Sequence, residues 1–136
     1  MLVAACIRNH PHYERARPVL EAIAGGKEVG VISAHSLAEM FSSLTAVPVV
    51  PRILPTEACA IIATNIKPHF QVVAVTAEMY AQAIDNCVAR GLGGGKVYDA
   101  LLIACARQSQ ADRIYTFNLH DFRRLAPDLA TRLAAP

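Results

Sequence analysis

Hydrophobic residues along this chain follow two spacings in turn. Runs such as Val29 to Ile32 are short and continuous, as in buried strands, whereas longer segments repeat a hydrophobic residue every three or four positions, as in amphipathic helices. Helices are expected over residues 11–24, 36–47, 56–65, 77–90, 96–108 and 127–133, and strands over 2–7, 29–32, 71–75 and 113–117. This alternation predicts an α/β fold, a three-layer α/β/α sandwich around a mainly parallel central sheet.

Small polar residues and glycines mark the expected ends of these helices. The run Gly91-Leu92-Gly93-Gly94-Gly95 predicts a flexible break between two helices. Ser and Thr side chains cap helices by accepting hydrogen bonds from the first free N–H groups. The residues placed to cap a following helix are Ser33 or Ser36, Thr56 and Thr76.

The composition fits a single domain over residues 1–136 in the cytoplasm. Hydrophobic residues make up 54% and charged residues 18%, which suits a sheet covered by helices on both faces. The net charge of +2 is too small to indicate nucleic-acid binding by itself. The cysteines stand singly among small hydrophobic residues, which predicts free thiols in a reducing compartment. No stretch resembles a membrane span or a signal peptide.

Three carboxylates lie in hydrophobic or turn-like segments, at Glu39, Asp99 and Asp121. Each alone has an ordinary interpretation: Asp99 as a helix-start residue, Glu39 on a polar helix face, and Asp121 in a turn. Placing each ionised carboxylate in hydrophobic surroundings would cost several kcal/mol of folding free energy unless it is paired or binds a metal. Because open α/β sheets bind ligands at the carboxyl ends of their strands, we expect the three to converge on a divalent cation. That arrangement is typical of a metal-dependent phosphodiesterase.

Other patterns are weaker. The run from Gly91 to Lys96 resembles a phosphate loop, but its glycine spacing is one residue short and Val97 stands where Ser or Thr is required. The histidines lack zinc-binding spacing. Arg8 and Lys96 are candidates for contact with an RNA phosphate, although surface solvation explains Arg8 equally well.

Several short motifs occur along nearly the whole chain in a characteristic order. They are Met1-Leu2-Val3-Ala4-Ala5, Ser36-Leu37-Ala38-Glu39, Tyr98-Asp99-Ala100-Leu101-Leu102-Ile103-Ala104 and Thr116-Phe117-Asn118-Leu119-His120-Asp121-Phe122. In this order they resemble the PIN-domain family, and within it the toxin ribonucleases of VapBC-type toxin–antitoxin pairs.

The resemblance implies a Mg²⁺- or Mn²⁺-dependent site for RNA cleavage. Glu39, Asp99 and Asp121 would be its acidic members and metal ligands. Asn118 would stand where the family often has Asp, and Thr116 would orient the site by hydrogen bonding. The family's usual first acidic residue, on an N-terminal strand, has no counterpart here. We favour a start codon assigned too late over a natural truncation that damages the site.

The sequence therefore favours a metal-dependent endoribonuclease, the toxin of a type II toxin–antitoxin system. The alternative is a catalytically impaired PIN-like protein that acts by binding RNA or antitoxin. A phosphatase or receiver-like domain with Asp99 as phosphate acceptor ranks last, because that acceptor normally ends a strand. By the resemblance, we expect a homodimer and an antitoxin that covers a groove near the helices over 11–24 and 36–47.

Overall fold

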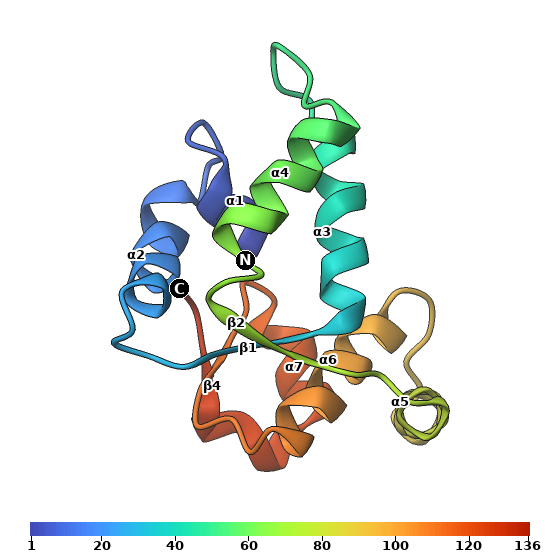
Figure 1. Cartoon of the computed structure of the whole chain (residues 1–136). Coiled ribbons are helices and arrows are strands. Elements are labelled where there is room, and N and C mark those ends of the chain that lie inside the picture. Colours follow the sequence, from blue (N-terminus) through green and yellow to red (C-terminus); the bar gives the residue numbers. More distant parts are fainter. The chain divides into compact units, whose positions relative to one another are not determined.

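The computed structural model describes residues 1–136, which divide into two compact units (Figure 1). The N-terminal unit covers Met1–Val72 and the C-terminal unit covers Val73–Pro136. The elements in chain order are α1 (Leu2–Cys6), α2 (Tyr13–Ala24), β1 (Gly30–Ser33), α3 (Ala34–Ala46), α4 (Pro55–Asn65), β2 (Phe70–Val73), α5 (Ala77–Ala89), α6 (Lys96–Gln108), β3 (Ile114–Tyr115), α7 (Leu119–Leu125), the 3₁₀ helix η1 (Pro127–Arg132) and β4 (Leu133–Ala134).

The N-terminal unit is a small helical assembly beside a pair of strands. Helix α1 packs against α2 and α3, and α3 packs along α4 (Figure 1). Strand β1 is hydrogen-bonded to β2. Gly30 allows this close packing, because a Cβ atom there would lie 2.6 Å from both Ile23 Cγ2 and Phe70 Cδ1. Glycine is therefore the residue that lets α2 and β2 approach the start of β1.

The C-terminal unit has its own hydrophobic core. Helix α5 packs against α6, and α7 packs against α6, η1 and β4. Strands β3 and β4 are parallel, with Ile114 opposite Leu133 and Tyr115 opposite Ala134. The largest fully buried side chains of this core come from the helices, and they are Leu101, Ile103 and Leu125. The core of this unit is therefore formed mainly by helices.

Two of the expected helix caps are confirmed. Ser33 Oγ accepts a hydrogen bond from Ser36 N at 3.0 Å, and Thr76 Oγ1 accepts one from Met79 N at 3.3 Å. The expected break between α5 and α6 is also present, and Gly91 ends α5 with a φ of 62°, which favours glycine. The cap proposed for α4 was wrong. That helix begins at Pro55, and the Glu57 carboxylate accepts from Leu54 N at 2.7 Å, so Thr56 lies inside the first turn.

The expected strand over residues 2–7 is also wrong, since this segment forms α1. A short apolar run does not distinguish a strand from a buried helix. Ala4 and Ala5 are buried, and their small side chains let α1 pack closely against its neighbours. Near the C-terminus, the helix expected over 127–133 is present as the 3₁₀ helix η1, and β4 begins at Leu133. Helix α7 follows β3 in a segment where no helix was expected.

Helices combined with parallel strands confirm the expected α/β fold class. Strands β2 and β3 are shorter than expected, and the strands form two separate two-stranded sheets, β1–β2 and β3–β4. No helix combines the length and the hydropathy needed to cross a membrane. All four cysteines are free; Cys87 and Cys105 are buried as expected, whereas Cys59 is exposed.

Candidate functional site

Polar side chains meet in the C-terminal unit at the starts of two helices. We call Lys96, Asp99, Asn118 and Asp121 the polar cluster. Lys96 and Asp99 belong to the first turn of α6, Asn118 is the N-cap residue of α7, and Asp121 lies in the first turn of α7. A helix N-terminus carries a partial positive charge that stabilises nearby carboxylates. The fold therefore places both carboxylates where their negative charge is tolerated.

One amide joins the two carboxylates. Asn118 Nδ2 donates a hydrogen bond to Asp99 Oδ2 at 3.1 Å and another to Asp121 Oδ2 at 2.7 Å. Residues separated by about twenty positions are thus linked through a single side chain. The structure brings together Asp99, Asn118 and Asp121, as the sequence predicted for this part of the site.

Lys96 forms an ion pair within the same cluster. Its Nζ donates to Asp121 Oδ2, the oxygen that also accepts from Asn118. The Asp121 side chain is only 11% exposed, whereas that of Lys96 is 38% exposed. The hydrogen bonds from Lys96 and then from Asn118 hold the pKa of Asp121 below its ordinary value. Asp121 is therefore ionised at neutral pH.

Thr116 contacts the polar cluster through the backbone of Asn118. It is buried, and its backbone N–H donates to Ala134 O at 2.9 Å, which ties it to the end of β4. Its Oγ1 accepts a hydrogen bond from Asn118 N at 3.0 Å. The Thr116 hydroxyl thus positions the backbone of the residue that bridges the two carboxylates.

Glu39 and Arg8 belong to the N-terminal unit. Glu39 is on α3 with a side chain that is 42% exposed, and its Oε1 lies 3.9 Å from His35 Nε2, one helical turn away. Arg8 is exposed in the turn after α1. The structure describes each within its own unit, and their membership of the site stays a prediction.

Sequence reasoning missed the ion pair between Lys96 and Asp121. It gave Lys96 as a candidate for contact with an RNA phosphate and Asp121 as a metal ligand. The hydrogen bond from Asn118 to Asp121 did have a sequence signal, because residues three positions apart lie on one face when the segment is helical. The contact between Lys96 and Asp121 had no sequence signal, because it depends on how α6 packs against α7.

The sequence profile of the PIN domain matches residues 1–127, a range that includes all four members of the polar cluster and Glu39. The chain belongs to the PIN domain family. PIN domains are generally nucleases, often in toxin–antitoxin systems, and they generally use divalent metals. No curated protein and no solved structure matches this PIN domain.

The polar cluster of this PIN domain offers oxygen donors of the kind that Mg²⁺ and Mn²⁺ prefer. Mg²⁺ is usually held by one or two carboxylates, with waters and substrate phosphates as the remaining ligands. Asp99 and Asp121 fit that donor set. No group of three or more His, Cys, Asp and Glu side chains able to hold a metal is present.

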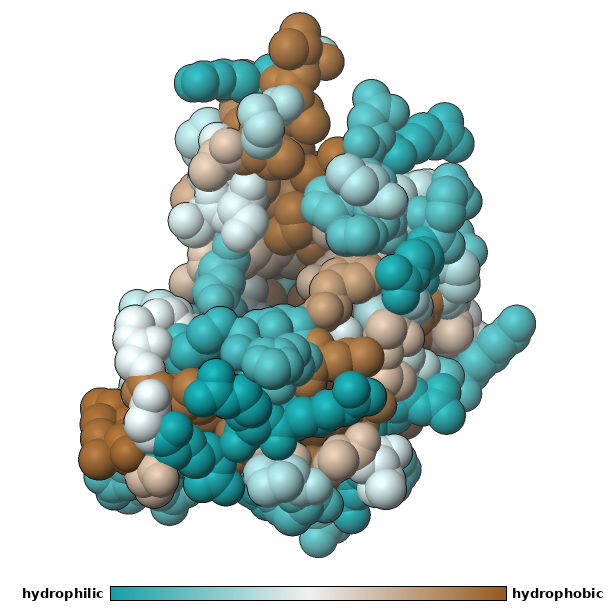
Figure 2. Space-filling view, turned by 180° about the vertical axis from the view of Figure 1, so that it is seen from behind, coloured by the Kyte–Doolittle hydropathy of each residue, from teal (hydrophilic) through white to brown (hydrophobic).

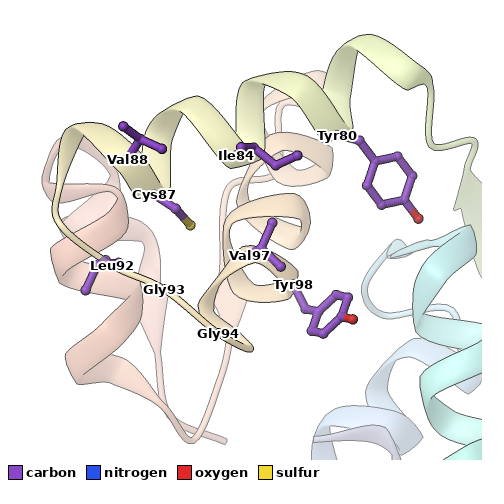
Figure 3. Close-up of a pocket in the computed structure, with 9 residues that line it drawn as sticks. All are labelled: Tyr80, Ile84, Cys87, Val88, Leu92, Gly93, Gly94, Val97 and Tyr98. Carbon is purple, nitrogen blue, oxygen red and sulfur yellow. The ribbon is translucent and has the colours of Figure 1, made fainter.

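An apolar pocket of 390 Å³ lies elsewhere in the same unit, between α5, α6 and their glycine-rich connection (Figure 3). Tyr80 and Tyr98 lie at one end of the pocket and Leu92 at the other (Figure 3). Ile84 and Val88 continue its rim along α5, and Val88 is 73% exposed. Figure 2 shows hydrophobic surface over this helix, at the lower left. The pocket carries almost no polar groups and is suited to apolar contact rather than to chemistry.

Proposed function

We propose that this PIN domain is a metal-dependent endoribonuclease that hydrolyses RNA phosphodiester bonds, and that it acts as the toxin of a type II toxin–antitoxin system. The observation that supports the activity is the bridge from Asn118 to both Asp99 and Asp121 in a chain of a nuclease family. A hydrogen-bonded pair of carboxylates, joined at the starts of two helices, is a preorganised set of oxygen ligands.

In this proposal, Asp99 and Asp121 hold a Mg²⁺ or Mn²⁺ ion, and Glu39 binds through water or holds a second ion. Such an ion, when bound, lowers the pKa of a coordinated water and stabilises the leaving oxygen of a phosphodiester. Asn118 keeps the carboxylates in place and orients a water, and Thr116 keeps Asn118 in place.

The remaining contribution of the chain is to position RNA. Arg8, exposed after α1, supplies a positive charge for the phosphate backbone. Lys96 supplies another beside the carboxylates when its ammonium is not engaged by Asp121. Phosphate contacts of this kind are independent of base sequence, so they position the strand without selecting the RNA.

The direct test is the Asp99→Asn variant in a Mn²⁺-dependent assay on a mixed RNA pool. We expect cleavage to fall by at least roughly 100-fold, because a lost metal ligand removes several kcal/mol of transition-state stabilisation. The amide is nearly isosteric, so the circular dichroism spectrum should not change. Asp85→Asn is the matched control, since Asp85 is exposed on α5 in the same unit. Full activity of Asp99→Asn would refute the proposed site.

One observation favours the alternative of an impaired PIN-like protein that acts by binding. The polar cluster holds only two carboxylates, and one of them is paired with Lys96. An impaired site would bind no Mn²⁺ at millimolar concentration and would still bind RNA or antitoxin. A Mn²⁺ titration of this chain, and of a form extended upstream in the reading frame, separates the two functions.

We also propose two protein partners. Tyr80, Ile84 and Val88 form an exposed apolar stripe on α5, and we assign it to homodimer formation. An antitoxin would cover the face of α2 and α3 that exposes Phe41, whereas Leu44 is buried core. Light scattering on Ile84→Asp should show a monomer where the wild type is a dimer. A wild type that is monomeric at all concentrations would contradict the dimer.

A further inference from the structure

One oxygen atom of Asp121 already has two N–H donors. Asp121 Oδ2 accepts from the ammonium of Lys96 and from the amide of Asn118, so both directions from which a cation would approach this atom are used by N–H donors. A carboxylate oxygen has room for about two strong partners. A divalent ion bound through Asp121 Oδ2 must therefore take the place of one of these donors.

Lys96 is the donor that can leave. The Lys96 side chain is 38% exposed, whereas that of Asp121 is 11% exposed. Water can therefore solvate the ammonium of Lys96 when it leaves Asp121. The lysine side chain reaches its partner through a flexible four-carbon stem, so it can swing away without a change of backbone. Asn118, in contrast, is held by Thr116 through its backbone and by Asp99 through its side chain.

We propose that Lys96 is a tethered counter-ion that occupies Asp121 in the metal-free chain, is displaced by a divalent cation, and is then free to contact an RNA phosphate. Lys96 thereby couples metal binding to RNA binding. It is a positioning residue that acts through Asp121, and this inference rests on the metal site of the proposed function.

The coupling has a simple electrostatic reason. In the metal-free chain the positive charge of Lys96 is balanced by Asp121 and attracts a phosphate only weakly. When a divalent cation neutralises the carboxylates, the displaced ammonium has no partner within the cluster, and a phosphate oxygen is a suitable acceptor. Metal and RNA would each increase the affinity for the other by the same factor.

The first test is the affinity for Mn²⁺ alone, measured by isothermal titration calorimetry on the full chain. Lys96→Met removes the competitor, and we expect it to bind Mn²⁺ roughly fivefold more tightly than the wild type, the factor that corresponds to a partly exposed ion pair. Lys96→Arg retains the charge and should bind no more tightly than the wild type. Lys67→Met, an exposed lysine at the end of α4, is the control for net charge and should leave the affinity unchanged.

The possible outcomes separate the two proposals. Equal Mn²⁺ affinity in the wild type and Lys96→Met would overturn the role of Lys96 and leave the metal site intact. No Mn²⁺ binding by either protein would overturn the metal site and the inference with it. Lys96→Gln, which keeps a hydrogen-bond donor without the charge, provides the same comparison if Lys96→Met does not fold.

The second test is the binding of a non-cleavable RNA oligonucleotide, followed by fluorescence anisotropy with and without Mn²⁺. The wild type should bind RNA more tightly when Mn²⁺ is present, and Lys96→Met should lose most of this gain. In the presence of Mn²⁺, the dependence of log affinity on log salt concentration should be shallower in the variant, by the amount that corresponds to about one phosphate contact. Without Mn²⁺ the two proteins should have the same slope. A gain from Mn²⁺ that is the same in both proteins would contradict the coupling.

Discussion

In the C-terminal unit, Asp99 and Asp121 come from two helices and both accept hydrogen bonds from Asn118. In the N-terminal unit, Glu39 Oε1 lies 3.9 Å from His35 Nε2 on the same helix. The first arrangement restricts the side chains to one geometry, because each carboxylate is held by a partner that is itself held. The Glu39 side chain is 42% exposed, compared with 11% for Asp121. The two units therefore differ in how firmly they hold their acidic side chains.

The largest expected difference between the units concerns activity. Glu39→Gln should lower Mn²⁺-dependent RNA cleavage roughly tenfold, as for a residue that acts through water or on an outer ligand, compared with at least roughly 100-fold for Asp99→Asn. Both rates are measured on one RNA substrate at saturating Mn²⁺. A loss for Glu39→Gln equal to that for Asp99→Asn would remove the distinction between the two units.

Core substitutions compare the units in stability rather than in activity. Leu44 and Leu101 are both fully buried, one in each unit. Leu44→Ala and Leu101→Ala should each lower the free energy of unfolding by about 2–5 kcal/mol, because each leaves a cavity. Urea unfolding followed by circular dichroism measures this loss. A single transition that shifts in both variants would show that the units unfold together, and two transitions that shift separately would show independent units.

Gly30→Ala tests the close packing of the N-terminal unit. The added Cβ would lie 2.6 Å from Ile23 Cγ2 and from Phe70 Cδ1, so we expect a loss of about 1–3 kcal/mol in the free energy of unfolding. Gly93→Ala in the C-terminal unit is the control. A Cβ there meets no atom within 4 Å, and the effect should stay within about 0.5 kcal/mol. Equal effects in thermal denaturation would show that Gly30 is not tightly packed.

The smallest expected effect is a pH dependence of stability in the C-terminal unit. The pKa of Asp121 in the folded chain lies below its ordinary value of 3.8, chiefly through the hydrogen bond from Lys96. This stabilisation is complete above about pH 4 and is lost as the pH falls through the lowered pKa. The melting temperature of the wild type should therefore exceed that of Lys96→Met above pH 4, and the difference should shrink in more acidic buffer. A difference that does not depend on pH would show that Lys96 stabilises the fold by packing.

The local sequence determined a large part of the fold. The amphipathic spacing from Lys96 to Gln108 predicted α6 with its observed bounds, and Ser33 and Thr76 were identified as caps because a hydroxyl before a helix satisfies its free N–H groups. These features depend on residues within one or two turns of each other. Asp99, Asn118 and Asp121 were expected to lie close together from their positions relative to the predicted elements, and the hydrogen bonds from Asn118 show that they do.

Only the tertiary structure decided how those residues are joined. The segment from Leu2 to Cys6 is a helix because Ala4 and Ala5 pack against other helices, and an apolar run alone does not specify this. Likewise, Lys96 was predicted from the sequence only as a candidate for contact with an RNA phosphate, and its partner in the structure is Asp121, 25 positions away in the chain. Hydrogen bonds and ion pairs act over a few ångströms, so contacts between α6 and α7 exist only after the core has brought the two helices together.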